Sequence, residues 1–347
     1  MRPCTKVGLD VTWRCNWNCA HCFYRRNPQL HQPVDVPLED LEVKVRQAWV
    51  GGLDHAIMVG YGEPTLYPKM RELLTFCRGL GMATSIITNG TAPIEKVQGF
   101  YDCGLDHLHF STHGTPETLA RITGHASAGA RQAALKVWLA SQGRPWRTNI
   151  AVQQLNYREL PAAAAHELNL GARHYVFLGF LPHYEWGRDP ECVRAIAPHP
   201  AEVRPFLQTA ARAVLERGVM MTIRYTPMCH LDPDLWPYVT NARHVFMDPF
   251  EWNYELQATD FEALWKASVR CGQSVACSEP CRDCLAYEHC GGWNRVMAAA
   301  YDGAGLAPIR EIPAEYADVW NQRGGLHDLN PANAHTGTFG VPAKAGG

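Results

Sequence analysis

The sequence has 347 residues, 46% of them hydrophobic and 19% charged, a composition typical of a folded chain with a large buried core. Lys and Arg number 32 against 34 Asp and Glu, so the formal net charge is −2 and no basic field favours a nucleic acid partner. There is no apolar run long enough to span a membrane and no signal-peptide pattern, so we expect a cytoplasmic protein without a membrane partner.

Strand-like and helix-like segments alternate along the first two thirds of the chain. Strands are predicted at 6–13, 55–62, 83–90, 105–114, 146–154, 172–180 and 219–226, and helices at 37–52, 68–81, 92–104, 129–143, 157–171 and 200–218. This alternation predicts βαβ units and a parallel sheet. With about six repeats, the fold class is α/β, a partial (β/α)6 barrel of the TIM type with its site at the carboxyl ends of the strands.

The composition changes after residue 226, where Pro, Trp and Cys become frequent. We therefore predict three parts: a barrel at 1–225, a Cys-rich domain at 226–310 and a C-terminal extension at 311–347. The end of that extension, 325–347, is small, polar and rich in Gly and Pro, so we expect the extension to be partly disordered.

Cysteine is abundant, with 13 residues. In a reducing compartment that number indicates metal sites rather than disulfides. One cluster comprises Cys15, Cys19 and Cys22, and a second comprises Cys271, Cys277, Cys281, Cys284 and Cys290. We expect the isolated Cys4, Cys77, Cys103 and Cys192 to be small buried hydrophobes.

The first cluster has three thiols within eight residues, directly after the first predicted strand. Thiolates favour iron–sulfur clusters and zinc, and a closed structural site needs four ligands. A three-thiolate site leaves one position open, which a small molecule can fill. A zinc knuckle is the structural alternative.

The spacing Cys15-x3-Cys19-x2-Cys22, with His21 in the aromatic place before the last cysteine, resembles the radical S-adenosylmethionine (SAM) enzymes. The resemblance implies a [4Fe-4S] cluster on the three cysteines, with SAM chelating its open iron. Reductive cleavage of SAM would give a 5′-deoxyadenosyl radical that abstracts hydrogen from a substrate. It also implies an electron donor such as flavodoxin or ferredoxin as a partner.

Two further motifs of this family follow predicted strands. Gly62 and Glu63 match its Gly-Gly-Glu-Pro motif, with Tyr61 in place of the first glycine. Thr88 and Asn89 match its Thr-Asn-Gly motif. The resemblance implies that these residues bind the cofactor, and glycine allows the backbone a close approach.

Weaker matches add Ser111, Arg121 and Asn156 to the implied cofactor site. Ser111 belongs to a Ser-x-Asp-Gly-like segment in which His113 replaces the acid. That histidine reflects either a different substrate or a buried, hydrogen-bonded imidazole. Arg121 would pair with the cofactor carboxylate, and an exposed helix arginine is the alternative.

The second cluster contains Cys281-x2-Cys284-x5-Cys290, which resembles the SPASM and twitch extensions of the family. The next cysteine of a full SPASM domain is replaced by Asn294, so the resemblance implies one auxiliary [4Fe-4S] cluster. For its fourth ligand we favour Cys229, with Cys271 and Cys277 as rivals. Zinc bound by four thiolates is the alternative.

The resemblance does not identify the substrate. One auxiliary cluster is typical of relatives acting on sugars, aminocyclitols or nucleoside-like compounds in natural product biosynthesis. We therefore expect a small-molecule substrate and an oxidoreductase or isomerase reaction, oxidation or epimerisation. The segment with His183, Tyr184, Glu185, Trp186 and Arg188 is either a pocket wall or a surface loop.

Two alternatives remain open. A maturase of a ribosomally made peptide is the first; the cysteine loop starts at residue 15, which leaves no room for a leader-binding domain before it, so a partner protein would have to serve. A non-catalytic iron–sulfur carrier or scaffold is the second, and the open position and the glycine motifs argue against it.

Overall fold

Eight parallel strands form one sheet in which every strand lies beside its neighbour in the sequence. The computed structural model describes residues 6–22, 35–60, 62–180, 189–240, 275–276, 281–290 and 293–320. The strands are β1 Lys6–Asp10, β2 His55–Val59, β3 Ala83–Thr88, β4 His107–Ser111, β5 Trp146–Val152, β6 His174–Gly179, β7 Met220–Arg224 and β8 Val239–Thr240. All seven neighbouring pairs are parallel, which confirms the predicted partial barrel.

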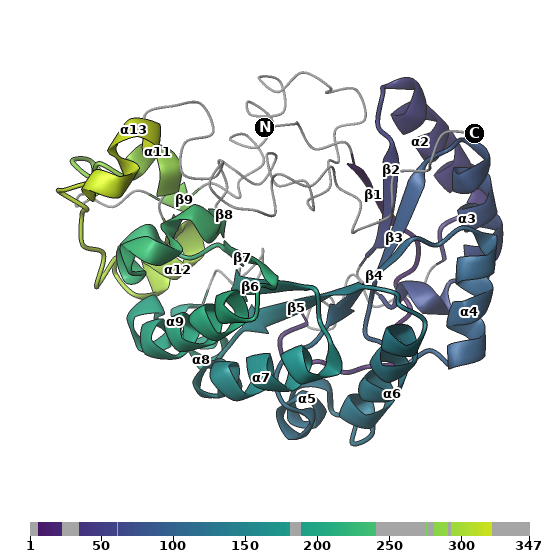
Figure 1. Ribbon diagram of the computed structural model, residues 1–347, viewed down its shortest axis with the longest axis horizontal. Helices are drawn as coiled ribbons and strands as arrows, with labels where there is room; N and C mark the ends of the chain where they lie inside the picture. The colour runs from purple at the N-terminus through teal and green to yellow at the C-terminus, as the bar shows by residue number, and fades with distance from the viewer. Residues whose placement is uncertain are drawn as a thin grey trace.

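The main helices lie along the outer side of the curved sheet (Figure 1). They are α2 Leu38–Val50, α3 Met70–Gly79, α4 Ile94–Cys103, α5 Pro116–Thr123, α6 Ala128–Ser141, α7 Leu160–Leu170, α8 Pro190–Ile196 and α9 Pro200–Glu216. Five of them lie within the predicted helical segments, and α6 begins one residue before its predicted segment. The short helices α5 and α8 were not predicted, because eight and seven residues carry too little periodicity.

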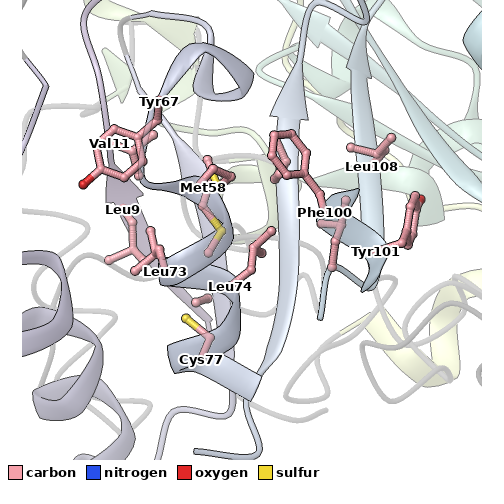
Figure 2. Close-up of a cluster of buried hydrophobic side chains, with 14 of the residues drawn as sticks. Leu9, Val11, Met58, Tyr67, Leu73, Leu74, Cys77, Phe100, Tyr101 and Leu108 are labelled. Atoms are coloured by element: carbon pink, nitrogen blue, oxygen red, sulfur yellow. The ribbon is translucent and has the colours of Figure 1, made fainter. Parts of the chain in front are cut away.

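The core between sheet and helices follows the two periodicities of the sequence (Figure 2). Leu9 and Val11 of the β1 segment point to the helices because alternate residues share a face. Leu73, Leu74 and Cys77, on one face of α3, pack against them. Cys77 is fully buried, and burial raises the pKa of its thiol to about 12.

The outcome differs among the other isolated cysteines. Cys77 confirms the prediction of a small buried hydrophobe, and Cys103 is half-buried against the same core. The prediction is wrong for Cys192, which is exposed, because it lies near the start of the short helix α8 on the surface. Cys4 lies outside the described residues.

The opposite face of the strands is polar at their amino ends. Lys6, His55 and His107 begin β1, β2 and β4 and are all buried. Burial, and secondarily the charge of Lys6, lowers the pKa of His107 to about 4. The His55 ring bonds the Ser85 hydroxyl at 2.7 Å, and its pKa is also lowered by burial. These imidazoles are therefore neutral at pH 7.

A second core extends from the barrel into the Cys-rich region. It joins the faces of β5, β6, β7, α7 and α9 to Ala286, Cys290, Tyr316 and Trp320. The Trp236 indole N–H donates to Met228 O and Leu231 O, both at 3.1 Å, and closes the turn after β7. The two regions thus share buried surface, while the predicted limits at 225 and 310 remain predictions.

The described part of the predicted Cys-rich region consists of short elements: η5 Met228–His230, η6 Pro233–Tyr238, β9 Val275–Ala276, α11 Tyr287–Cys290, β10 Trp293–Asn294 and α12 Arg295–Ala300. In the predicted C-terminal extension the described elements are η8 Ala314–Tyr316 and α13 Ala317–Trp320. The Tyr316 hydroxyl donates to Pro233 O at 2.9 Å, so the start of the predicted C-terminal extension packs against η6. Residues 321–347 lie outside the described residues. Among the helices that the structure describes, none has the length and apolar character needed to cross a bilayer.

Candidate active site

The cysteine loop, residues 11–22, follows β1 and carries Cys15, Cys19 and Cys22, all half-buried. Its backbone is fastened to the end of α5: Asn18 N–H donates to Thr123 O at 3.0 Å, and Ala20 N–H donates to Ile122 O at 2.7 Å. A turn brings the second and third cysteines together, with Cys22 N–H donating to Cys19 O at 3.0 Å. The protein itself therefore holds the three thiols on one ordered loop.

A side-chain ring fastens the same loop to the end of β3. Asn89 Nδ2 donates to Asn16 Oδ1 at 2.7 Å, and Asn16 Nδ2 donates to Thr91 Oγ1 at 2.9 Å. Thr91 in turn donates its hydroxyl to Asn89 Oδ1 at 2.7 Å. Asn89 was predicted to bind the cofactor, whereas Asn16 was not singled out, although it lies between two of the cysteines.

Gly62 lies where the loop after β2 meets the cysteine loop. A Cβ atom at this position would be 2.4 Å from Arg14 O and 2.6 Å from Thr12 O. The next residue, Glu63, donates its N–H to Arg14 O at 2.7 Å. The close backbone approach that the sequence predicts therefore occurs between Gly62 and the protein's own cysteine loop. Tyr61 lies outside the described residues.

Glu63 braces the ends of β2 and β3. Its buried carboxylate accepts from Thr65 Oγ1 at 2.6 Å, from Thr88 Oγ1 at 2.7 Å and from Asn89 N–H at 2.6 Å. Burial raises the pKa of Glu63, and these hydrogen bonds act in the opposite direction. Oε2 accepts only one of these bonds and retains capacity for a further donor. Cofactor binding by Glu63 and Thr88 remains a prediction.

His21 lies at the other end of the loop, against the ends of β4 and β5. Its ring meets His113 edge-on at 4.5 Å between centroids and Phe180 at 6.3 Å. Its Nδ1 bonds Gln153 Nε2 at 3.0 Å. Burial lowers the pKa of His21 to about 4 and that of His113 well below its usual range, so both rings are neutral at pH 7.

His113 and Asn156 join the loops after β4 and β5. His113 is buried, and Ala151 N–H donates to its Nδ1 at 3.4 Å. Asn156 Nδ2 donates to His113 O and Ala151 O, both at 2.8 Å, and its Oδ1 accepts from Gln153 N–H at 2.8 Å. The structure therefore favours the buried, hydrogen-bonded alternative for His113, and it gives Asn156 a role in shaping the strand ends.

Arg121 stands apart from this group. Its Nη2 donates to Thr118 Oγ1 at 2.7 Å and pairs with Glu159 at 3.1 Å, and its side chain is 58% exposed. This is the exposed helix arginine of the two alternatives. Ser111, by contrast, ends β4 beside Asn89, because the same Gln132 side chain donates to the carbonyls of both residues.

Four of the remaining cysteines line one apolar cavity next to the barrel. Cys229 of η5, Cys281, Cys284 and Cys290 form its wall together with Ile309 and neighbouring residues. The rivals Cys271 and Cys277 lie outside the described residues, as do His183, Tyr184, Glu185, Trp186 and Arg188. Among the described residues, the favoured Cys229 is the one that joins the other three.

Backbone amides point at these sulfur atoms. Ile309 N–H donates to Cys284 Sγ at 3.2 Å, and Met228 N–H donates to Cys290 Sγ at 3.4 Å. Burial and the neighbouring Cys281 and Cys284 raise the pKa of Cys229, while the Ala307 amide acts in the opposite direction. Amide hydrogen bonds to sulfur are a feature of iron–sulfur sites, where they tune the potential.

The donor sets fit iron–sulfur clusters. Within the described ranges, no three His, Cys, Asp or Glu side chains converge tightly enough to hold a single metal ion. In a cubane cluster each thiolate binds a different iron, so thiols that line a common space suit it. The four thiols around the cavity meet that requirement, and the three thiols of the first group lie on one loop. The ligand assignments remain predictions.

Comparison with known proteins identifies the barrel. The model of the radical SAM superfamily matches residues 10–160, which include the cysteine loop, β2 to β5 and the motifs after them. Residues 10–160 are a radical SAM domain. Such a domain implies a [4Fe-4S] cluster and SAM as cofactors.

Individual relatives agree with the radical SAM assignment. The chain is 27% identical over 193 residues to the PqqA peptide cyclase of Methylocella silvestris, a match covering 52% of this chain and 49% of that relative. The matched part thus spans about half the length of the curated relative.

Two solved structures share the fold of this chain. The structure of anSMEcpe with bound AdoMet superposes with a TM-score of 0.54 at 14% identity, over 86% of this chain and 95% of that one. Streptococcus suis SuiB bound to S-adenosylmethionine gives a TM-score of 0.52 at 18% identity, over 63% of this chain and 50% of that one.

Proposed function

We propose that this chain is a radical SAM enzyme that modifies a ribosomally made peptide. The observation that carries the proposal is the sequence match to a PqqA peptide cyclase, 27% identical over 193 residues. This reverses the order expected from the sequence, where a sugar, aminocyclitol or nucleoside-like substrate came first. Oxidation or epimerisation of such a small molecule is the second candidate, because one auxiliary cluster suffices for it.

In this proposal Cys15, Cys19 and Cys22 would hold the cluster that binds SAM, and the bound pair would supply a hydrogen-abstracting radical. The chain's own residues prepare the site. Asn16 and Gly62 hold the cysteine loop against the ends of β2 and β3. Both anchors are formed by the protein's own groups, and such supporting contacts hold a site in one geometry.

The neighbourhood of His21 is suited to a reactive intermediate. Its ring and that of His113 are neutral at pH 7, since burial lowers both pKa values. Phe180 adds an apolar ring to the same surface. Exclusion of bulk water by such rings would protect a radical from side reactions.

Cys229, Cys281, Cys284 and Cys290 would hold one auxiliary cluster. Their cavity is apolar, and the second core connects it to the barrel, so a substrate at the mouth would lie between two redox sites. A protein such as flavodoxin or ferredoxin would supply the electron that starts SAM cleavage.

The test combines cluster reconstitution with mass spectrometry. Anaerobically reconstituted protein is incubated with SAM, dithionite and short peptides encoded next to its gene, with Cys19→Ala as the inactive control. We expect 5′-deoxyadenosine together with a peptide product lighter by two hydrogens, the mass change of a crosslink. A modified sugar or nucleoside with unmodified peptides would favour the second candidate, and no 5′-deoxyadenosine under any condition would favour the iron–sulfur carrier.

A further inference from the structure

A polar network is buried beneath the strand ends that carry the candidate cofactor residues. Gln132 and Lys136 lie one turn apart on α6, with 2% and 1% of their surfaces exposed, and they face the sheet rather than solvent. A buried glutamine and a buried lysine cost free energy unless every polar atom finds a partner. Their contacts therefore report what the fold requires at this position.

Gln132 uses its full hydrogen-bonding capacity. Its Nε2 donates to Asn89 O at 2.9 Å and to Ser111 O at 3.0 Å. Its Oε1 accepts from Thr112 Oγ1 at 2.8 Å and from Lys136 Nζ at 2.9 Å. Two donors and two acceptors are all that a primary amide has, and this pattern also fixes which end is nitrogen.

Lys136 binds the oxygen of the Gln132 amide and is itself paired with Glu167. Its Nζ lies 2.7 Å from both carboxylate oxygens of Glu167 on α7, and the Glu167 side chain is 1% exposed. Thr112 Oγ1 accepts from the same ammonium at 2.8 Å, and Thr148 Oγ1 donates to Glu167 at 2.7 Å. Since the charges are paired and hydrogen-bonded, Gln132 Oε1 has one defined orientation.

Asn89 links the Gln132 amide to Glu63 and to the cysteine loop. Its N–H donates to Glu63 and its side chain donates to Asn16, while its carbonyl is the group that Gln132 binds. Two hydrogen bonds therefore connect Gln132 to the cysteine loop. The bond to Ser111 O ties the end of β4 to the same amide.

We infer that Gln132 is a positioning residue for the SAM site: it sets the spacing of the ends of β3 and β4 and, through Asn89, the position of the cysteine loop. In this inference Gln132 does not contact the cofactor. The Lys136–Glu167 pair fixes the orientation of the Gln132 amide. The inference rests on the radical SAM domain and is independent of the substrate that the enzyme modifies.

The test replaces the hydrogen-bond donor of the Gln132 amide by an acceptor and keeps the shape of the side chain. In Gln132→Glu an oxygen replaces Nε2 and faces the carbonyls of Asn89 and Ser111, while the contact with Lys136 can persist. Gln142→Glu, the same change at the exposed C-terminal end of α6, is the matched control. Both variants and the wild type are reconstituted anaerobically, and iron content, thermal unfolding and SAM affinity are measured, the last by the perturbation of the electron paramagnetic resonance signal.

We expect Gln132→Glu to be folded at the assay temperature and to keep its iron, but to bind SAM at least tenfold more weakly than the wild type. Gln142→Glu should bind SAM as the wild type does. An unchanged dissociation constant in folded Gln132→Glu would overturn the inference and leave Gln132 a structural residue. If Gln132→Glu does not fold, Thr112→Val decides. It removes the hydroxyl that donates to Gln132 Oε1 and accepts from Lys136 Nζ, and it leaves both Nε2 hydrogen bonds of Gln132 in place. A rise of about threefold in the SAM dissociation constant supports the inference, and an unchanged constant overturns it.

This outcome is separate from the proposed function. Wild-type protein that binds SAM and yields no modified peptide contradicts the peptide proposal and leaves the comparison of the Gln132 variants intact. Wild-type protein that takes up iron but shows no SAM perturbation would remove the basis of both.

Discussion

Replacing Lys136 by methionine leaves the buried Glu167 carboxylate without its ion-pair partner. The side chains are similar in length, so the change removes the ammonium and keeps most of the packing. Glu167 then stays buried with Thr148 Oγ1 as its remaining hydrogen-bond donor at 2.7 Å, having lost an ammonium 2.7 Å from each oxygen. Gln132 Oε1 loses one of its two donors as well.

The magnitude follows from these losses. Removing one partner of a buried ion pair destabilises a protein by about 3–5 kcal/mol, since the other charge stays desolvated. Replacing both charges in Lys136→Met/Glu167→Met removes that penalty and leaves unmade hydrogen bonds at about 1 kcal/mol each. The double variant is therefore expected to be more stable than Lys136→Met alone.

The unfolding free energy is measured by urea denaturation of the full chain under reducing conditions. Lys69→Met is the matched control, because the Lys69–Glu72 pair on α3 is exposed at 58% and 48%, with a separation of 3.4 Å. Exposed pairs contribute less than about 1 kcal/mol, so the control should remain near wild type.

The unfolding free energies of the wild type and the variants are compared at pH 8. A loss below about 1 kcal/mol at pH 8, equal to that of Lys69→Met, would refute the reasoning that this pair is buried and mutually dependent.

Four further outcomes follow from the site and the core. Cys19→Ala should abolish 5′-deoxyadenosine formation, measured by mass spectrometry, and cleavage that persists would contradict the cluster assignment. The pair Cys281→Ala/Cys284→Ala should remove about half of the iron and leave some uncoupled SAM cleavage; unchanged iron content would mean that this cavity holds no cluster. Gly62→Ala forces a Cβ to within 2.4 Å of Arg14 O and should weaken SAM binding by about tenfold or more, whereas equal affinity would show that the cysteine loop can move away. The pKa of His107 in the folded protein is lowered to about 4, so the unfolded chain takes up this proton first as the pH falls. The unfolding free energy should therefore decrease from pH 6.5 towards pH 4, and His107→Leu should reduce that slope by up to about 1.4 kcal/mol per pH unit.

Local signals in the sequence were sufficient for the order of elements. Alternating apolar positions in the β1 segment and the 3.6-residue pattern of α3 are local properties, and both reappear in the core. The cysteine spacing is local too, since three thiols within eight residues lie close along the chain in any fold. Short elements such as α5 escaped prediction, because eight residues carry too little periodicity.

The partners of the polar residues were decided by tertiary structure. Nothing near Gln132 in the sequence indicates that its amide joins Asn89 to Ser111, because those residues lie 43 and 21 positions away. Arg121 matched a family segment, yet the fold pairs it with Glu159 on the surface.

The sequence alone determined the chemistry of the donors: soft thiols in two groups, and glycine where a backbone must approach closely. It left open whether Cys229, Cys271 or Cys277 joins Cys281, Cys284 and Cys290. The turn after β7 carries Cys229 to the cavity formed by Cys281, Cys284 and Cys290, across more than 50 intervening residues. Such a convergence depends on how the sheet and α9 pack against the Cys-rich region, and packing over that separation leaves no periodic signal in the chain.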